Sequence, residues 1–165
     1  MKISLKEVNS SAEQRVDFDY TADFSSEEVM GEYPFKEPFE IKGYVALKGD
    51  AGYLNGSIEG RVFTFCARCL KPVDYVCRAE AEYYITDDIE SDGMDDLLYI
   101  EADEIDLDEI FFQELLLNMK STVLCSEDCK GLCPVCGKNL NDGDCGCTRK
   151  EIDPRLSKLA ELLGK

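Results

Sequence analysis

Residues 125–147 read CSEDCKGLCPVCGKNLNDGDCGC and contain six of the nine cysteines of the chain. Two further cysteines, Cys66 and Cys69, form a CxxC pair far upstream. The 165 residues include no histidine, so a tetrahedral site for a soft metal ion has to be built from thiolates. Because a CxxC turn places both sulfurs on one ion, and because structural zinc takes four such ligands, this stretch predicts a zinc-bound module.

Eight cysteines are predicted zinc ligands because they fall into CxxC, CxxxC and CxC pairs. They are Cys66, Cys69, Cys125, Cys129, Cys133, Cys136, Cys145 and Cys147. We expect two zinc ions, one held by Cys133, Cys136, Cys145 and Cys147 and the other by Cys66, Cys69, Cys125 and Cys129. The alternative is one zinc held by Cys66, Cys69, Cys133 and Cys136, with four thiols to spare. The ninth cysteine, Cys77, is expected in the protein core.

Alternation of apolar and polar residues predicts a strand-rich body upstream of this module. It is clearest over Val73–Ile85, where every second residue is apolar, and it recurs over residues 15–20, 39–48 and 53–65. The CxxC pair at 66–69 then falls at the turn of a hairpin. Shorter extended segments are expected at Met1–Val8 and Leu97–Ile100.

Two helices are expected outside these strands. One lies near residues 107–120, with Asp106 as its N-cap and an apolar side that packs on the sheet. The other spans 151–165, where Pro154 follows the N-cap candidate Asp153. The predicted fold class is α+β: an antiparallel, barrel-like or sandwich-like body at 1–122, a zinc module at 123–150 packed on the hairpin at 66–69, and the terminal helix.

The charge of the chain is concentrated in its middle. The net charge is −17, and residues 79–119 hold 15 acidic and no basic side chains. Such a region, named here the acidic belt, repels phosphate and disfavours diffuse nucleic-acid binding. It is either a solvated surface or a docking surface for a basic protein.

Other classes of protein are disfavoured by what the sequence lacks. No apolar run approaches the ~20 residues of a membrane span, and MKISLKEVNS is not a signal peptide. We therefore expect a cytoplasmic protein with no membrane partner, whose cysteines bind metal rather than form disulfides. Closed all-thiolate sites are weak Lewis acids, and no nucleophile or phosphate-loop motif accompanies them, so we expect no enzymatic activity and no small-molecule substrate.

Basic and amide side chains flank both groups of cysteines, and zinc knuckles can present such groups to unpaired RNA bases. The candidates for RNA contact are Arg61, Arg68, Lys71, Arg78, Lys130, Lys138, Asn139, Arg149 and Lys150, with Asn141 beside them. The alternative role of these residues is to solubilise the surface and to balance the thiolate charge.

The motifs CARCL at 66–70 and CSEDCKGLCPVCGKNLNDGDCGC at 125–147, separated by an acidic stretch, resemble those of the bacterial YceD family. The resemblance implies a cytoplasmic, non-enzymatic factor in large-subunit ribosomal RNA processing or accumulation and in ribosome assembly. Large-subunit ribosomal RNA, or its precursor, would be its partner. The alternative function is an acidic interaction module or chaperone for a basic ribosomal protein, without direct RNA contact.

Overall fold

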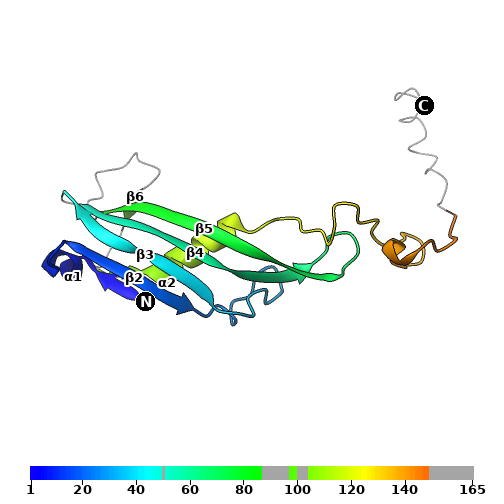
Figure 1. Ribbon diagram of the computed structural model, residues 1–165, viewed down its shortest axis with the longest axis horizontal. Coiled ribbons are helices and arrows are strands. Elements are labelled where there is room, and N and C mark those ends of the chain that lie inside the picture. Colours follow the sequence, from blue (N-terminus) through cyan, green and yellow to red (C-terminus); the bar gives the residue numbers. More distant parts are fainter. Residues whose placement is uncertain (50, 87–96, 100–103, 149–165) are drawn as a thin grey trace, which may run out of the picture.

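The computed structural model describes residues 1–49, 51–86, 97–99 and 104–148 (Figure 1). Within them the elements are β1 (Lys2–Ser4), α1 (Leu5–Ser10), β2 (Arg15–Ala22), β3 (Phe39–Lys48), β4 (Ala51–Phe65), β5 (Pro72–Thr86), β6 (Leu97–Tyr99), β7 (Glu104–Asp106), α2 (Leu107–Asn118) and the short 3-10 helix η2 (Leu140–Asp142).

The body is a five-stranded sheet with the strand order β2-β3-β4-β5-β6. Its neighbours pair antiparallel except for β6, which runs parallel to β5. A second, two-stranded sheet joins β1 to β7 antiparallel. Figure 1 shows α2 lying across one face of the large sheet.

The hairpin β4–β5 is longer than the rest of the sheet. Pairing of β3 with β4 begins at Glu40 and Glu59, whereas β4 and β5 remain paired as far as Phe65 and Pro72. The last part of the hairpin therefore extends alone beyond the sheet, as Figure 1 shows, toward the cysteine-rich segment.

Helix α2 packs closely on the sheet because glycines leave room for its rings. Gly43 and Gly56 are paired across β3 and β4. A Cβ atom at Gly56 would lie 2.7 Å from Phe111 and 3.1 Å from Phe18, whose rings meet edge to face. The largest cluster of buried residues forms between the sheet, α2 and β1, so the body has one core.

The predicted α+β, antiparallel, strand-rich fold class is confirmed: the described strands form a five-stranded and a two-stranded sheet, accompanied by the α-helices α1 and α2. The alternating segment Val73–Ile85 is β5, with Cys77 buried in the core. The helix predicted near 107–120 is α2, and the Asp106 side chain accepts a hydrogen bond from the Asp108 N–H at 3.1 Å.

The extended segment predicted over Met1–Val8 is wrong beyond Ser4, because helix α1 begins at Leu5. The Ser4 hydroxyl caps this helix by accepting the Lys6 N–H at 3.2 Å. The helix predicted at 151–165 lies outside the described residues, and the division of the chain into domains stays a prediction. None of the helices in the described ranges has the length and hydropathy of a membrane-spanning segment.

Candidate metal centres and the hairpin tip

The turn between β4 and β5 brings two cysteines to the end of the hairpin. The Cys66 N–H donates to the Lys71 carbonyl at 2.8 Å, and the Leu70 N–H donates to the Cys66 carbonyl at 2.9 Å. Leu70 has φ of 58°, in the left-handed region where the turn reverses. Both sulfur-bearing side chains, Cys66 and Cys69, are buried there.

Four cysteines meet at this turn, and we name them the tip group: Cys66, Cys69, Cys125 and Cys129. Their sulfurs all lie within 4.8 Å of one another. The Sγ–Sγ distance is 3.7 Å between Cys66 and Cys129 and 3.6 Å between Cys69 and Cys125. A tetrahedral zinc ion with Zn–S bonds of about 2.3 Å needs sulfurs about 3.8 Å apart, whereas a disulfide needs about 2.0 Å. The spacing fits a shared metal ion.

The segment that supplies Cys125 and Cys129 is also hydrogen-bonded to the turn. The Ala67 N–H donates to the Val123 carbonyl at 2.9 Å, and the Leu132 N–H donates to the Arg68 carbonyl at 3.1 Å. The Arg68 guanidinium donates to the Cys129 carbonyl at 2.9 Å. Residues more than 50 positions apart in the chain thus form one compact end of the molecule.

A second set, named the module group, consists of Cys133, Cys136, Cys145 and Cys147, again with all sulfurs within 4.8 Å of one another. Its knuckle is closed by two hydrogen bonds: Cys133 N–H to the Lys138 carbonyl at 2.8 Å, and Gly137 N–H to the Cys133 carbonyl at 2.9 Å. Gly137 has φ of 75°, which glycine adopts without strain. The module group is more open to solvent than the tip group, because Cys136 is exposed.

The two groups have the membership that the two-ion scheme expects. The one-ion alternative requires Cys66 and Cys69 to share an ion with Cys133 and Cys136, but the structure places these two pairs in different groups. Either group could hold a metal ion, and the identity of that ion stays a prediction.

Backbone N–H groups favour thiolates in both groups. Burial opposes ionisation of Cys66, but the backbone N–H groups of Arg68, Cys125 and Cys69 outweigh it and lower its pKa to about 6. The N–H groups of Cys136 and Val135 lower the pKa of Cys133 to about 6. Within the same group the neighbouring sulfurs, first that of Cys136, raise the pKa of Cys147 to about 12. Four adjacent thiols therefore lose their protons together only when a cation lies between them. A divalent metal ion is such a cation.

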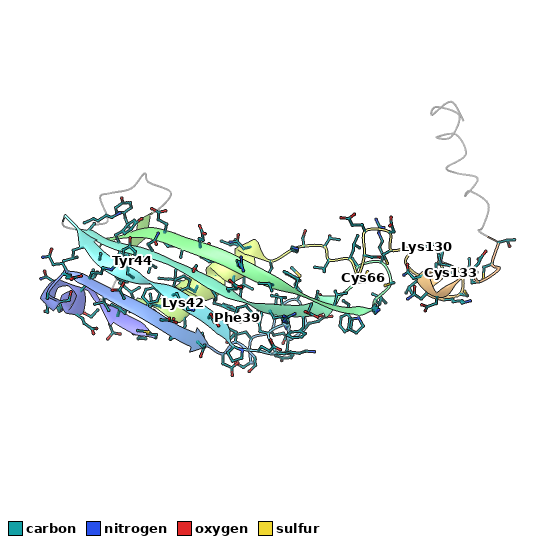
Figure 2. The ribbon with its side chains drawn as sticks, viewed as in Figure 1. Phe39, Lys42, Tyr44, Cys66, Lys130 and Cys133 are labelled. Carbon is teal, nitrogen blue, oxygen red and sulfur yellow. The ribbon has the colours of Figure 1, made fainter. Side chains whose placement is uncertain are left out.

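Asn141 connects the two groups. Its side-chain amide donates to the Cys129 sulfur at 3.4 Å, and this contact lowers the pKa of Cys129. Its side-chain oxygen accepts the Lys130 N–H at 2.8 Å. Figure 2 shows Lys130 between Cys66 and Cys133, at the junction of the two groups. Asn141 belongs to η2, so a residue of the module orients a sulfur of the tip group.

Of the residues predicted to contact RNA, two arginines lie along the hairpin and are held by carboxylates. Arg61 forms ion pairs with Asp74 and, at 3.8 Å, with Glu37. Arg78 pairs with Glu59 at 2.7 Å. These guanidinium groups are already neutralised, which leaves the cations at the turn and the module as the better candidates.

The remaining candidates within the described residues lie at the tip or in the cysteine module. Lys71 and Lys130 are exposed, and no carboxylate within the described ranges forms an ion pair with either. The Lys138 ammonium donates to the Asp144 carbonyl at 3.0 Å, and the Asn139 side chain caps η2 by accepting the Asn141 N–H at 3.0 Å. Arg149 and Lys150 lie outside the described residues.

Sequence reasoning missed a set of aromatic side chains beside the tip. Phe65 is 49% exposed and Tyr33 is 55% exposed. The alternation within β4 could have revealed them. Phe63 and Phe65 are one and three positions from the core residue Val62, so a strand places them on the opposite face.

The comparisons with known proteins agree on one family for this chain. Residues 54–163 match the family model "Large ribosomal RNA subunit accumulation protein YceD". The uncharacterized protein YlbN of Bacillus subtilis is 28% identical over 172 residues, which cover 99% of this chain and 96% of YlbN. The uncharacterized protein Rv2926c of Mycobacterium tuberculosis is 33% identical over 115 residues, covering 67% of this chain and 55% of that protein.

A plant protein is also similar over a shorter stretch. The chloroplastic "Large ribosomal RNA subunit accumulation protein YCED homolog 1" of Arabidopsis thaliana is 37% identical over 62 residues, covering 38% of this chain and 19% of that protein. No solved structure matches the chain significantly.

Proposed function

Because the chain belongs to the YceD family of large ribosomal RNA subunit accumulation proteins, we propose that it supports accumulation of that RNA by binding it, or its precursor, through the hairpin tip. The role is non-enzymatic and is exerted in the cytoplasm. The RNA-binding end comprises the tip group with Arg68, Lys71 and Lys130.

The observation that carries this proposal is the convergence of cations at the tip group. Arg68 and Lys71 come from the turn after β4, and Lys130 follows Cys129 in sequence. The tip group and the Arg68–Cys129 hydrogen bond, between residues 61 positions apart, bring these segments together. Exposed lysines and arginines gathered on one end are suited to phosphate contacts.

We propose zinc as the ion in both groups, because the donor sets consist of four thiolates at tetrahedral spacing. Bound zinc would supply cross-links rather than chemistry. In the tip group it would fix the turn to the segment 123–133, and the Asn141 amide and the turn N–H groups would stabilise the thiolates.

The acidic belt supports a directional approach. Its 15 carboxylates and absence of basic residues repel phosphate from residues 79–119. RNA is therefore expected to contact the cationic tip rather than the belt, and binding is selective rather than diffuse.

The test is binding of fluorescent large-subunit ribosomal RNA fragments to the zinc-loaded protein, measured by anisotropy over a range of salt concentrations. The variant Lys71→Gln/Lys130→Gln should bind more weakly, and its salt slope should fall by about 1.4 if each lysine contacts one phosphate of a single strand. Lys2→Gln/Lys42→Gln is the matched control: it removes the same charge from lysines that form surface ion pairs elsewhere on the body.

Equal weakening by both double variants would mean that only net charge matters, and would contradict binding through the tip. A wild-type protein that shows neither RNA affinity in solution nor RNA crosslinks in cells would exclude direct contact.

A second candidate function rests on the acidic belt itself, as a docking surface for a basic ribosomal protein. Neutralising Asp87, Asp88, Asp92, Asp95 and Asp96 should then abolish capture of that partner, while leaving any RNA affinity unchanged. Unchanged capture would exclude this role.

A further inference from the structure

A small pocket lies on the hairpin beside the tip group, on the side of β4 that carries Phe63 and Phe65. Its volume is about 390 Å³, and its lining includes Tyr33, Lys36, Phe63 and Phe65, together with Glu32 and Asp74. We name the site formed by Tyr33, Lys36, Phe63 and Phe65 the aromatic pocket.

The pocket is fixed in place by backbone pairing where β3 no longer covers β4. The Phe63 N–H donates to the Pro34 carbonyl at 2.9 Å, which holds the segment around Tyr33 and Lys36 along the edge of β4. Phe65 is paired with Pro72 across the hairpin. The aromatic residues are therefore positioned by the sheet and not by a loop alone.

Two rings of the pocket are open to solvent. Phe65 is 49% exposed and Tyr33 is 55% exposed, so both present ring surface to a ligand. A cluster of Tyr44, Tyr53 and Tyr84 elsewhere on the sheet differs at its centre, because Tyr53 is only 5% exposed and the Lys48 ammonium lies 3.0 Å from its ring centroid. The central ring of that cluster is covered by the protein itself, whereas the rings of Phe65 and Tyr33 are not.

Cations surround the pocket without being neutralised. The Lys36 ammonium lies 5.3 Å from the Phe63 ring centroid, and Lys71 follows in the adjacent turn. Neither forms an ion pair with a carboxylate in the part of the chain that the structure describes. Glu32 and Asp74 also line the pocket. The Asp74 carboxylate is paired with Arg61, and the Glu32 carboxylate offers an acceptor to the amino group of a base.

We propose that the aromatic pocket stacks an unpaired base of RNA, with Lys36 and Lys71 on the flanking phosphates. This inference rests on the proposed RNA-binding function and adds what that function leaves open: the ligand is single-stranded RNA. Open aromatic faces flanked by cations suit splayed bases, whereas a duplex keeps its bases stacked within the helix.

The test compares a fluorescent 12-nucleotide single-stranded RNA of mixed sequence with the duplex of the same sequence, using the zinc-loaded chain of 165 residues. Phe65→Leu keeps an apolar side chain but loses the ring, and should weaken single-strand binding about tenfold. Phe65→Trp should retain the binding of the wild type. Val76→Ala is the matched control, because Val76 is also 49% exposed on the hairpin but does not line the pocket.

The outcomes separate this inference from the proposed function. Single-strand binding that is lost in Lys71→Gln/Lys130→Gln but unchanged in Phe65→Leu would overturn the pocket and leave the proposed function intact. Absence of RNA binding by the wild type would overturn both. Loss of a protein partner in Phe65→Leu, with RNA affinity unchanged, would assign the pocket to that partner and overturn the inference. If Phe65→Leu fails to retain two zinc ions, Tyr33→Leu takes its place, with the same expected weakening.

Discussion

Removing the tip group should destabilise the whole sheet, although its cysteines lie outside the main core. We expect Cys66→Ser/Cys69→Ser to lose one of two zinc ions and to keep the fold of the body. A metal cross-link between Cys69 and Cys125 closes a loop over a sequence separation of 56 residues. That loop contains β5 and α2, which contribute to the core. The link therefore lowers the conformational entropy of this part of the unfolded chain and so stabilises the folded state.

The size of the effect follows from the loop length. Treated as a covalent cross-link, closure of a loop of about 56 residues contributes about 4 kcal/mol to the free energy of unfolding. This is a large fraction of the 5–15 kcal/mol that is typical of small domains. With an m-value of about 2 kcal/mol/M, the urea midpoint of the body should fall by about 2 M.

The assay is urea unfolding at saturating zinc, followed by far-ultraviolet circular dichroism, with the metal content measured on the same samples. Cys145→Ser/Cys147→Ser is the matched control: it should also lose one ion, but the module group closes only local loops and the urea midpoint of the body should not move. Equal midpoint shifts in the two double variants, or two ions retained in Cys66→Ser/Cys69→Ser, would refute the reasoning.

Three further changes have defined outcomes. Gly60→Ala should lower the free energy of unfolding by about 1–3 kcal/mol in urea titrations, because the new Cβ would lie 2.2 Å from the Phe39 ring. Burial, followed by the hydrogen bond to Asp108, raises the pKa of Tyr20, so native Tyr20 keeps its proton above pH 10 while unfolded tyrosine ionises. Stability should therefore fall as pH rises above about 10, and Tyr20→Phe should flatten this fall in unfolding curves measured at several pH values. Asn141→Ala should weaken zinc binding at the tip group about 10–100-fold in competition with a chelator, because a sulfur loses its amide donor.

Each of these has a result that would contradict it. Gly60→Ala at wild-type stability would mean that the Phe39 ring moves without cost, and Ser57→Ala on the exposed face of β4 serves as the control. An unchanged decline above pH 10 in Tyr20→Phe would assign that decline to other groups. Equal loss of affinity at both groups in Asn141→Ala would point to general unfolding of the module instead.

The strands of the body were predictable because one face of each is buried. In β5 the buried Cys77, Ala79 and Ala81 alternate with exposed charged residues, and the period alone identifies a strand. The same reasoning failed at Leu5, because alternation over two apolar residues is too short to distinguish a strand from the first turn of a helix. There the Ser4 cap decides the outcome.

The membership of the cysteine groups could be reasoned from spacing, because the module group is local and leaves two distant pairs for the tip group. The aromatic pocket could not be reasoned in this way. It depends on the register that pairs Phe65 with Pro72 and on the contact of Phe63 with the segment at Pro34, and neither is encoded in a local pattern. The same holds for Asn141, whose contact with Cys129 requires η2 to fold back.

The sequence separation within the tip group also sets an order of events during synthesis. Cys66 emerges from the ribosome 63 residues before Cys129. At 5–20 residues per second, this interval lasts about 3–13 s. The β4–β5 hairpin can form in that time, but its two thiols have no partner thiols for a metal ion and stay open to oxidation. A nascent chain that lacks a metal ion for the tip group, or that is delayed after Cys69, would thus leave these two sulfurs exposed for longer.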